Sequence, residues 1–222
     1  MTSLLTKLIA GDNCRKTRFH DEKGNLIPIS QLLYLPLNIL FLARAKIFKH
    51  YPQLPWIPFN VINRMEKLLS REWVMVEFGS GMSTLWYARR VKFLYSIEHD
   101  ACWYRKISRE IEKNHLTNVK YELRGLDDYS TLDDLADKSL DFIVVDGAQR
   151  SACLTAALNK LKQGGYLYLD NSDKDMTIPH GDMRLSEKIL RDAVKASHGQ
   201  LWEFTGLTVA MISSHQGMLA RL

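Results

Sequence analysis

Two glycines one residue apart follow an apolar run that ends in an acid, within residues 74–84 (VMVEFGSGMST). Glycine lets the backbone turn sharply and brings bare N–H groups close to a ligand, at a point where a Cβ atom would clash. A strand, a glycine turn and a helix in this order predict a nucleotide-sized pocket beside the Glu77 carboxylate. Thr84 replaces the third glycine of the dinucleotide pattern G-x-G-x-x-G, and Glu77 precedes the first glycine. The pattern therefore favours a cationic ligand over a pyrophosphate.

This run resembles the first motif of class I S-adenosylmethionine-dependent methyltransferases, in which an acid precedes G-x-G on the first strand. The resemblance implies S-adenosylmethionine as the cofactor, with Glu77, Gly79 and Gly81 around its methionine half and the acid near its amino group. Ser80 and Ser83 belong to the same turn and are also predicted to bind the cofactor. The alternative is an α/β protein without a methyl donor, because glycine also serves simply to turn a corner.

A second acid ends the next predicted strand, residues 93–98, at Glu98. Its distance from the glycine turn suits a carboxylate that accepts both hydroxyls of a ribose, so Glu98 is the predicted ribose ligand. The alternative is that Glu98 caps the following helix, although Asp100 is the better cap. After the third strand, Asp127 and Asp128 stand where this family commonly holds the adenine. Two acids before a helix are equally typical of an N-cap and first turn.

Polar side chains also end the fourth and fifth predicted strands, where Asp146 follows residues 140–145 and Asp170-Asn171 follow residues 165–169. Neighbouring parallel strands would bring these side chains together beside the methyl group of the cofactor. Two carboxylates and an amide suit Mg²⁺, and they resemble the metal triad of catechol and caffeoyl-type O-methyltransferases. Such an ion would activate an acceptor hydroxyl and align it with the methyl group. A metal-independent site with an Asx turn is the alternative.

The predicted catalytic residues are Asp146 and His180. Gln149, shortly after Asp146, is neutral, so a histidine base must come from elsewhere. His180 lies in the polar loop 173–182 just beyond the fifth strand, although a loop histidine is also consistent with simple exposure. Asp170 is followed by Asn-Ser-Asp rather than by the Pro-Pro-aromatic signature of amino-methylating DNA enzymes. A small-molecule oxygen is therefore the expected acceptor, and no nucleic acid is expected.

Composition indicates an ordinary folded chain of 222 residues, with 46% hydrophobic and 25% charged residues. That length allows one α/β domain and a modest extension. The three cysteines have no disulfide or zinc-ligand spacing, which favours a reducing compartment. The first ten residues lack a signal-peptide core, so a cytoplasmic location is expected. The wider sequence resembles bacterial methyltransferases.

From Trp73 onward, strand and helix patterns alternate, which predicts a mostly parallel Rossmann-like sheet with helices on both faces. A final pair of strands joined at Gly206-Leu207 must be antiparallel, because a parallel pair needs a long crossover. Seven strands closed by such a hairpin are also what the methyltransferase resemblance implies. We expect strands near 73–78, 93–98, 118–123, 140–145, 164–170, 201–205 and 208–212, and helices near 83–90, 101–114, 130–136, 151–162 and 183–197.

The sequence divides into a helical N-terminal extension, residues 1–70, and a predicted methyltransferase domain, residues 71–222. The extension carries ten Lys/Arg and four Asp/Glu, whereas the remainder is nearly neutral. It should contain a short helix near its start, a turn at 21–24, a Pro-rich stretch at 51–58 and a helix near 60–70.

The extension also contains an apolar stretch, residues 31–48, that we expect Pro36 to break. Its most apolar part is shorter than the ~20 residues that a membrane span requires. Because Arg44, Lys46 and Lys49 follow it, residues 31–49 are predicted as a peripheral membrane contact. A helix that covers the domain core and a homodimer contact are the alternatives.

Taken together, these patterns favour an S-adenosylmethionine-dependent methyltransferase that methylates a small-molecule oxygen, with or without Mg²⁺. A nicotinamide-dependent oxidoreductase is one rival, because it also places a glycine turn beside a ribose carboxylate. A non-catalytic binding or membrane-surface module is the other rival.

Overall fold

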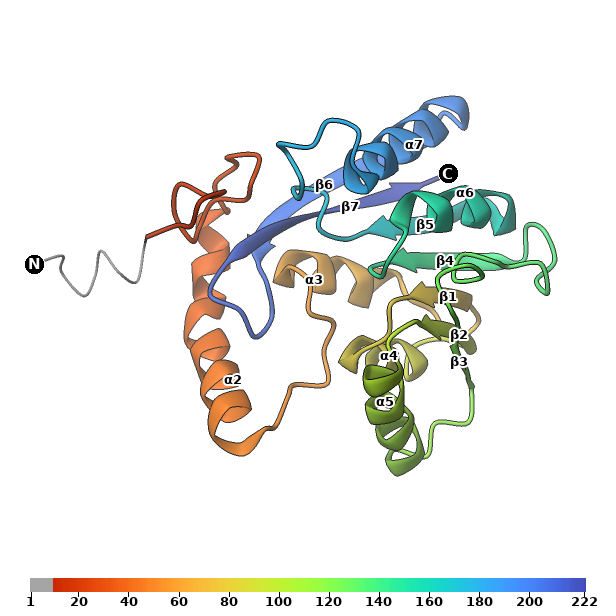
Figure 1. Cartoon of the computed structure of the whole chain (residues 1–222), viewed down its shortest axis with the longest axis horizontal. Coiled ribbons are helices and arrows are strands. Elements are labelled where there is room, and N and C mark those ends of the chain that lie inside the picture. The colour runs from red at the N-terminus through yellow and green to blue at the C-terminus, as the bar shows by residue number, and fades with distance from the viewer. Residues whose placement is uncertain (1–9) are drawn as a thin grey trace, which may run out of the picture.

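The computed structural model describes residues 10–222, which form one twisted sheet with helices on both faces (Figure 1). The strand order is β3-β2-β1-β4-β5-β7-β6. The first five strands in this order are parallel, and β7 is antiparallel to both β5 and β6. The predicted fold class is confirmed. The strands are β1 (Val74–Phe78), β2 (Phe93–Glu98), β3 (Val119–Leu123), β4 (Leu140–Val145), β5 (Leu161–Leu169), β6 (Gln200–Leu207) and β7 (Ser214–Arg221).

Apolar side chains of the central strands point alternately to the two faces, so each face has its own core. Val76 and Ile143 pack with the helices α6 and α7, whereas Met75 and Phe142 pack with α3 and α4. Because helices cover both faces of the sheet, β1 and β4 are almost continuously apolar. The helices are η1 (Ile29–Tyr34, a 3₁₀ helix), α2 (Leu35–Phe48), α3 (Phe59–Leu68), α4 (Met82–Ala88), α5 (Ala101–Lys113), α6 (Arg150–Lys160) and α7 (Asp182–Ala196).

The helix predicted near 130–136 is wrong, because the connection from β3 to β4 consists of turns. Two of these turns are closed by backbone hydrogen bonds from Thr131 to Asp128 and from Leu135 to Leu132. Tyr129, Leu132 and Leu135 are buried against the sheet and fix the segment from one side. Aspartate, serine and threonine side chains between them compete with helix formation. Asp127 and Asp128 therefore begin no helix, and their predicted alternative role as an N-cap is wrong.

The C-terminal hairpin is confirmed, but the predicted turn at Gly206-Leu207 is wrong. Strand β6 continues through Leu207, the loop occupies residues 208–213, and the second strand is β7 rather than residues 208–212. The Asn38 side chain holds this loop, since its Nδ2 donates to the carbonyl oxygens of Thr208 (2.8 Å) and Met211 (2.6 Å). The first half of β7 is polar but buried, because it lies between β6, the loop after β5 and the N-terminal extension.

The apolar segment of the extension forms the continuous helical stretch η1–α2, which lies beside the sheet in Figure 1. The predicted break at Pro36 is wrong: this residue occupies the first turn of α2. Proline fits there because its missing N–H would have no partner within the helix. The turn at 21–24 is confirmed by the hydrogen bond from Gly24 N to Asp21 O, at 3.1 Å. Most of the predicted short helix near the start falls in residues 1–9, outside the described residues.

A buried ionic cluster ties the extension to the loop that follows β5. The Arg15 guanidinium contacts carboxylate oxygens of Glu22 at 2.9 Å and of Asp173 at 3.7 Å. Its Nε also donates to the Ser214 carbonyl oxygen on β7 at 3.2 Å. Lys174 forms a second ion pair with Glu22 at 2.8 Å. The extension therefore borders the carboxyl end of β5, and its division from the rest of the chain at residue 70 stays a prediction.

Candidate cofactor and acceptor site

The glycine turn connects β1 to α4 at the carboxyl ends of the parallel strands. Gly79 has a φ of +89°, and a Cβ atom there would lie 2.7 Å from both the Asp146 carbonyl oxygen and the Gly147 Cα. Both the conformation and the close approach of the β4 end require glycine at this position. The Gly81 N–H donates to Thr84 Oγ1 at 3.1 Å, which caps α4. Thr84 thus fixes the entry of the helix where dinucleotide-binding proteins have a third glycine.

Glu77 lies beneath this turn and is almost fully buried. Its carboxylate accepts hydrogen bonds from the hydroxyls of Ser83, Thr84 (2.6 Å) and Ser96 (2.8 Å). Burial raises the pKa of Glu77 to about 7, although the three hydroxyl donors act in the opposite direction. The free protein therefore holds a carboxyl group that ionises near neutral pH.

Glu98 faces the glycine turn from the end of β2. Its Oε2 accepts hydrogen bonds from the Ser80 N–H (3.1 Å) and hydroxyl (2.8 Å). Its Oε1 accepts from the backbone N–H groups of His99 and Asp100, each at 2.8 Å. Asp100 is the residue that caps α5, by accepting from the Trp103 N–H at 2.6 Å. Glu98 is therefore fixed beside the turn, and its side-chain partners are the Ser80 hydroxyl and the His99 imidazole, whose Nδ1 lies 3.2 Å from Oε1.

A small hollow of about 80 Å³ opens between the glycine turn and the end of β4. Trp103 lies on one side, and its Nε1 donates to the Ser80 carbonyl oxygen at 2.7 Å. Trp56 comes from the Pro-rich segment of the extension, and its ring lies 6.2 Å from that of Trp103. Within the described part of the chain, the buried Trp56 Nε1 has no hydrogen-bond partner. The lining residues are Trp56, Ser80, Gly81, Met82, Ser83, Trp103 and Asp146.

A guanidinium group connects the strand ends at which a metal ion was predicted. Arg150, in the first turn of α6, donates to Asp146 Oδ1 and to Asn171 Oδ1, each at 3.2 Å. It also donates to the backbone oxygens of Asp170 (2.7 Å) and Gly147 (3.0 Å). The predicted convergence of Asp146, Asp170 and Asn171 is thus present, with Arg150 as its cationic partner.

The two carboxyl groups of this cluster differ in environment. Asp170 is buried, and the Tyr168 hydroxyl donates to its Oδ1 at 2.6 Å. Burial and the neighbouring Asp146 carboxylate raise the pKa of Asp170 well above its ordinary value. Burial also raises the pKa of Asp146, but the Arg150 guanidinium opposes this effect. The more buried Asp170 therefore holds a proton more readily, while Asp146 lines the hollow beside a cation.

Arg150 competes with the predicted Mg²⁺ ion for Asp146 and Asn171, and the metal site stays a prediction. The Arg150 guanidinium donates hydrogen bonds to the side-chain oxygens of Asp146 and Asn171. A metal ion would have to bind the same two oxygens. Across residues 10–222, His, Cys, Asp and Glu side chains form no group of three that would hold a metal ion.

Two predicted site residues lie away from the hollow. His180 is exposed in the loop after β5, and Asp127 is exposed in the turns after β3. Neither lines the hollow. Their roles as general base and adenine ligand stay predictions. Arg150 is a site residue that was not predicted, although a cation in the first turn of a helix opposes the helix dipole and so indicates an anionic partner elsewhere.

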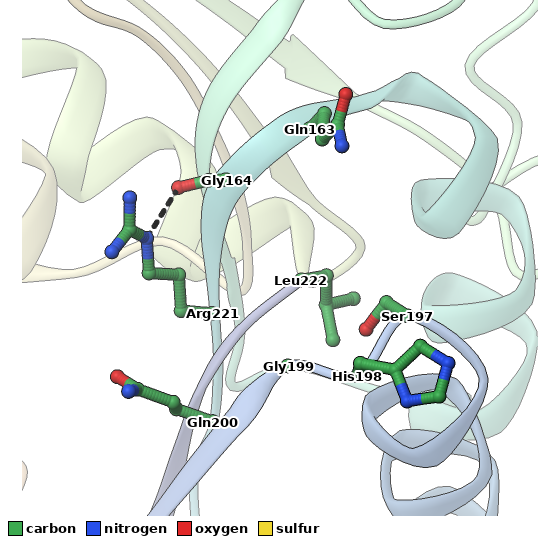
Figure 2. A pocket seen from close by; sticks show the side chains of 8 residues that line it. All are labelled: Gln163, Gly164, Ser197, His198, Gly199, Gln200, Arg221 and Leu222. Atoms are coloured by element: carbon green, nitrogen blue, oxygen red, sulfur yellow. Dashed lines mark hydrogen bonds between the residues drawn. The ribbon is translucent and has the colours of Figure 1, made fainter.

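A larger pocket, of about 470 Å³, lies at the other end of the sheet, where β5 begins and β7 ends (Figure 2). The Arg221 side chain lines it and donates to the Gly164 carbonyl oxygen at 3.2 Å. None of the predicted site residues lines this pocket. Ligands of open α/β sheets bind at the carboxyl ends of the strands, so the smaller hollow is the candidate site.

Comparison with known proteins gives a family match to this part of the chain. Residues 76–172 match the family model of a methyltransferase domain. A candidate O-methyltransferase from Klebsiella pneumoniae has a TM-score of 0.60 and 17% identity, covering 99% of this chain and 94% of its own. An rRNA methylase from Streptococcus thermophilus has a TM-score of 0.55 and 16% identity, covering 74% and 95%.

A candidate methyltransferase from Streptococcus mutans in complex with SAH has a TM-score of 0.54 and 15% identity, covering 74% of this chain and 98% of its own. At such identities these likenesses show a shared fold. No curated protein sequence matches the chain.

Proposed function

We propose that this chain is a class I S-adenosylmethionine-dependent methyltransferase and that it methylates an oxygen atom of a small molecule. The observation that carries the proposal is the hollow at which the glycine turn, the β4 carboxylate Asp146 and two tryptophans meet. A cofactor on the glycine turn would direct its methyl group toward Asp146 and the end of β5. An acceptor would then enter from the side covered by the extension.

The cofactor would be held by groups that the structure already fixes. Glu98 would bind the ribose hydroxyls through Oε2 once the Ser80 hydroxyl rotates away, while the backbone N–H groups of His99 and Asp100 hold Oε1. Ser83 lies between Glu77 and the hollow, so its rotation would bring the Glu77 carboxylate to the amino group of the cofactor. The unpartnered Trp56 Nε1 would donate to the ligand. Because the hollow is small, Trp56 must move outward on binding.

The transfer step requires a nucleophilic oxygen and an acceptor for its proton. The acceptor oxygen attacks the methyl carbon, and the carbon–sulfur bonding electrons return to sulfur, which leaves S-adenosylhomocysteine. Asp146 would take the hydroxyl proton, since burial raises its pKa and makes it a stronger base. Arg150 would hold Asp146 and Asn171 in place throughout. Positioning of the two reactants supplies much of the rate in such a reaction.

A small acceptor is favoured over RNA by the covered site. Trp56 and Trp103 lie over the hollow and leave little room for a base attached to a polymer. The likeness to the candidate O-methyltransferase extends over 99% of the chain and so includes the extension. The likeness to the rRNA methylase covers 74%.

Cofactor binding is tested by titrating the protein with S-adenosylhomocysteine and, separately, with NAD⁺. We expect S-adenosylhomocysteine to raise the melting temperature and NAD⁺ to leave it unchanged. Glu98→Ala should weaken binding at least tenfold, because two ribose hydroxyls lose a charged acceptor. Glu112→Ala, on the exposed side of α5, is the matched control. Stabilisation by NAD⁺ alone would support an oxidoreductase, and stabilisation by neither ligand would support a non-catalytic module.

The acceptor class is tested with S-adenosylmethionine labelled in its methyl group. Hydroxyl-bearing small molecules and total RNA are supplied in parallel, each with and without a chelator of divalent ions. We expect label in the small-molecule fraction and equal rates with the chelator. Arg150→Met should reduce the rate at least tenfold, because it removes the cation that holds Asp146. Label in RNA would refute the acceptor class, and loss of activity in chelator would refute the metal-independent site.

A further inference from the structure

The helical stretch η1–α2 has two uncharged polar side chains turned inward and many of its large apolar side chains turned outward. Asn38 is fully buried, and its amide binds the β6–β7 loop through Thr208 O, Met211 O and the Ala210 N–H. Gln31 is also buried. By contrast, six large apolar side chains of the same stretch are more than half exposed: Ile29, Leu33, Ile39, Leu40, Ile47 and Phe48. We call these six side chains the outer face.

Such a face is unusual on a folded chain in water. The whole stretch, Ile29–Phe48, is 20 residues long and apolar enough to cross a membrane by length and composition alone. It is fastened sideways to the folded body, however, by Asn38 and by the stacking of Tyr34 on Phe59, whose rings lie 4.4 Å apart. A helix held in this way presents one long side to its surroundings. Contiguous exposed apolar surface of this kind marks a contact with a membrane or a protein.

The charged residues of this stretch distinguish between a membrane and a second copy of the chain as the partner of the outer face. Arg44, Lys46 and Lys49 are exposed at the end of the stretch. The sequence contains no Asp or Glu between Glu22 and Glu66. A second copy laid along the same helix would therefore bury these cations without a carboxylate from that helix to pair with them. Anionic lipid headgroups supply that negative charge, and the long Lys and Arg side chains reach them while the apolar side chains enter the lipid.

We propose that the outer face binds the interface of a membrane that contains anionic lipids, with η1–α2 lying parallel to the bilayer surface. The apolar side chains enter the boundary between headgroups and acyl chains, and the three cations contact the headgroups. The rest of the chain stays on the aqueous side, since α2 is attached along its inner side by Asn38. This contact requires neither cofactor nor methyl transfer, so it stands or falls separately from the proposed activity.

The full chain is tested by co-sedimentation with two kinds of vesicle: phosphatidylcholine alone, and phosphatidylcholine in which about a third of the lipid is phosphatidylglycerol. We expect at least tenfold tighter binding to the anionic vesicles, weakened by added salt. The double variant Leu40→Ser/Ile47→Ser should lose this binding. Leu185→Ser, which changes an exposed leucine on α7, is the matched control and should bind as the unmodified protein does.

A second variant set, Arg44→Gln/Lys46→Gln/Lys49→Gln, tests the charges without altering apolar side chains. It should lose the preference for anionic lipid. Thermal unfolding checks that each variant is folded, and sedimentation equilibrium measures its oligomeric state. Absence of vesicle binding, or binding unchanged in both variant sets, overturns the proposal. A dimer that does not bind vesicles and that Leu40→Ser/Ile47→Ser dissociates would also overturn it, in favour of a second copy on the outer face.

Discussion

Replacing Glu77 by glutamine is expected to stabilise the free protein and to weaken cofactor binding. Glu77 is 1% exposed, and burial raises its pKa from 4.5 to about 7. A carboxyl group whose pKa is higher in the folded chain than in the unfolded chain stabilises the fold only while it is protonated. That contribution is complete below the unfolded pKa of 4.5 and is lost as the pH rises through about 7. The free protein should therefore become less stable between these two values.

The magnitude follows from the two pKa values. The difference between 4.5 and about 7 corresponds to roughly 3 kcal/mol in the free energy of unfolding. Glutamine has nearly the same shape and stays neutral, so the Glu77→Gln protein avoids this loss. Relative to the unmodified protein, the variant should gain about 3 kcal/mol as the pH rises from about 4 to about 8.

Denaturant unfolding across this pH range measures the difference, because other titrating groups affect both proteins alike. Glu112→Gln is the control, since this exposed acid on α5 has no buried charge to relieve. Parallel pH profiles for the unmodified and Glu77→Gln proteins would refute the reasoning that burial perturbs this carboxyl group.

Cofactor binding should respond in the opposite direction. If ionised Glu77 contacts the amino group of the cofactor, affinity for S-adenosylhomocysteine rises as the pH passes through about 7. The Glu77→Gln protein should bind at least tenfold more weakly at about pH 8 and lose this pH dependence. Equal affinity of the two proteins would place Glu77 outside the cofactor contact and assign it a purely structural role.

Three further substitutions test the packing around the site by denaturant unfolding. Gly79→Ala should lower the free energy of unfolding by about 3 kcal/mol or more, because the φ of Gly79 is +89° and the added Cβ would lie 2.7 Å from backbone atoms. Its control, Gly24→Ala, should lower it by about 1 kcal/mol, because Gly24 has a similar φ of +85° but open space around it. Arg15→Met should cost about 3 kcal/mol by removing the cation beside the buried Asp173 carboxylate, whereas Lys188→Met, from an exposed pair, should cost about 0.5 kcal/mol or less. Asn38→Leu should cost about 3 kcal/mol, since backbone groups of the β6–β7 loop lose their partners.

The parallel strands were predictable because their sequences determine them locally. Residues 93–98 and 140–145 were predicted with the same bounds as β2 and β4. Both are compact, mainly apolar segments bounded by polar residues, which is typical of strands covered on two faces. The order of the elements then leaves few topologies, because crossovers are right-handed. These features need no knowledge of distant contacts.

The errors occurred where distant segments determine local structure. Residues 214–217 (SHQG) have the composition of a turn, yet they begin β7 because β6 pairs with them on one side and Ser172 and Asp173, in the loop after β5, bond Gln216 on the other. Residues 130–136 have helical spacing of leucines, but Leu132 and Leu135 are buried in turns against the sheet. Propensity is a weak guide where tertiary contacts satisfy the backbone in another way.

The site could be predicted as a set of strand ends but not as a chemical arrangement. Strand order alone brings Asp146, Asp170 and Asn171 together, as the sequence indicated. Whether they receive a metal ion or a guanidinium depends on the side chain of Arg150 from the following helix. That side chain is held by contacts to residues on two strand ends, and such geometry has no local sequence pattern.

The orientation of α2 shows that a nearly uniform apolar helix is positioned by its few polar residues. Its apolar side chains surround the axis, so periodicity gives no preferred face. Burying Asn38 satisfies backbone groups that would otherwise each cost about 1 to 3 kcal/mol. The same rotation leaves large apolar side chains outside, and burying each would contribute about 1.5 to 3 kcal/mol. Asn38 thus determines which side of the helix faces the folded body. Burial of the outer face in lipid would then supply a driving force for association with a membrane surface.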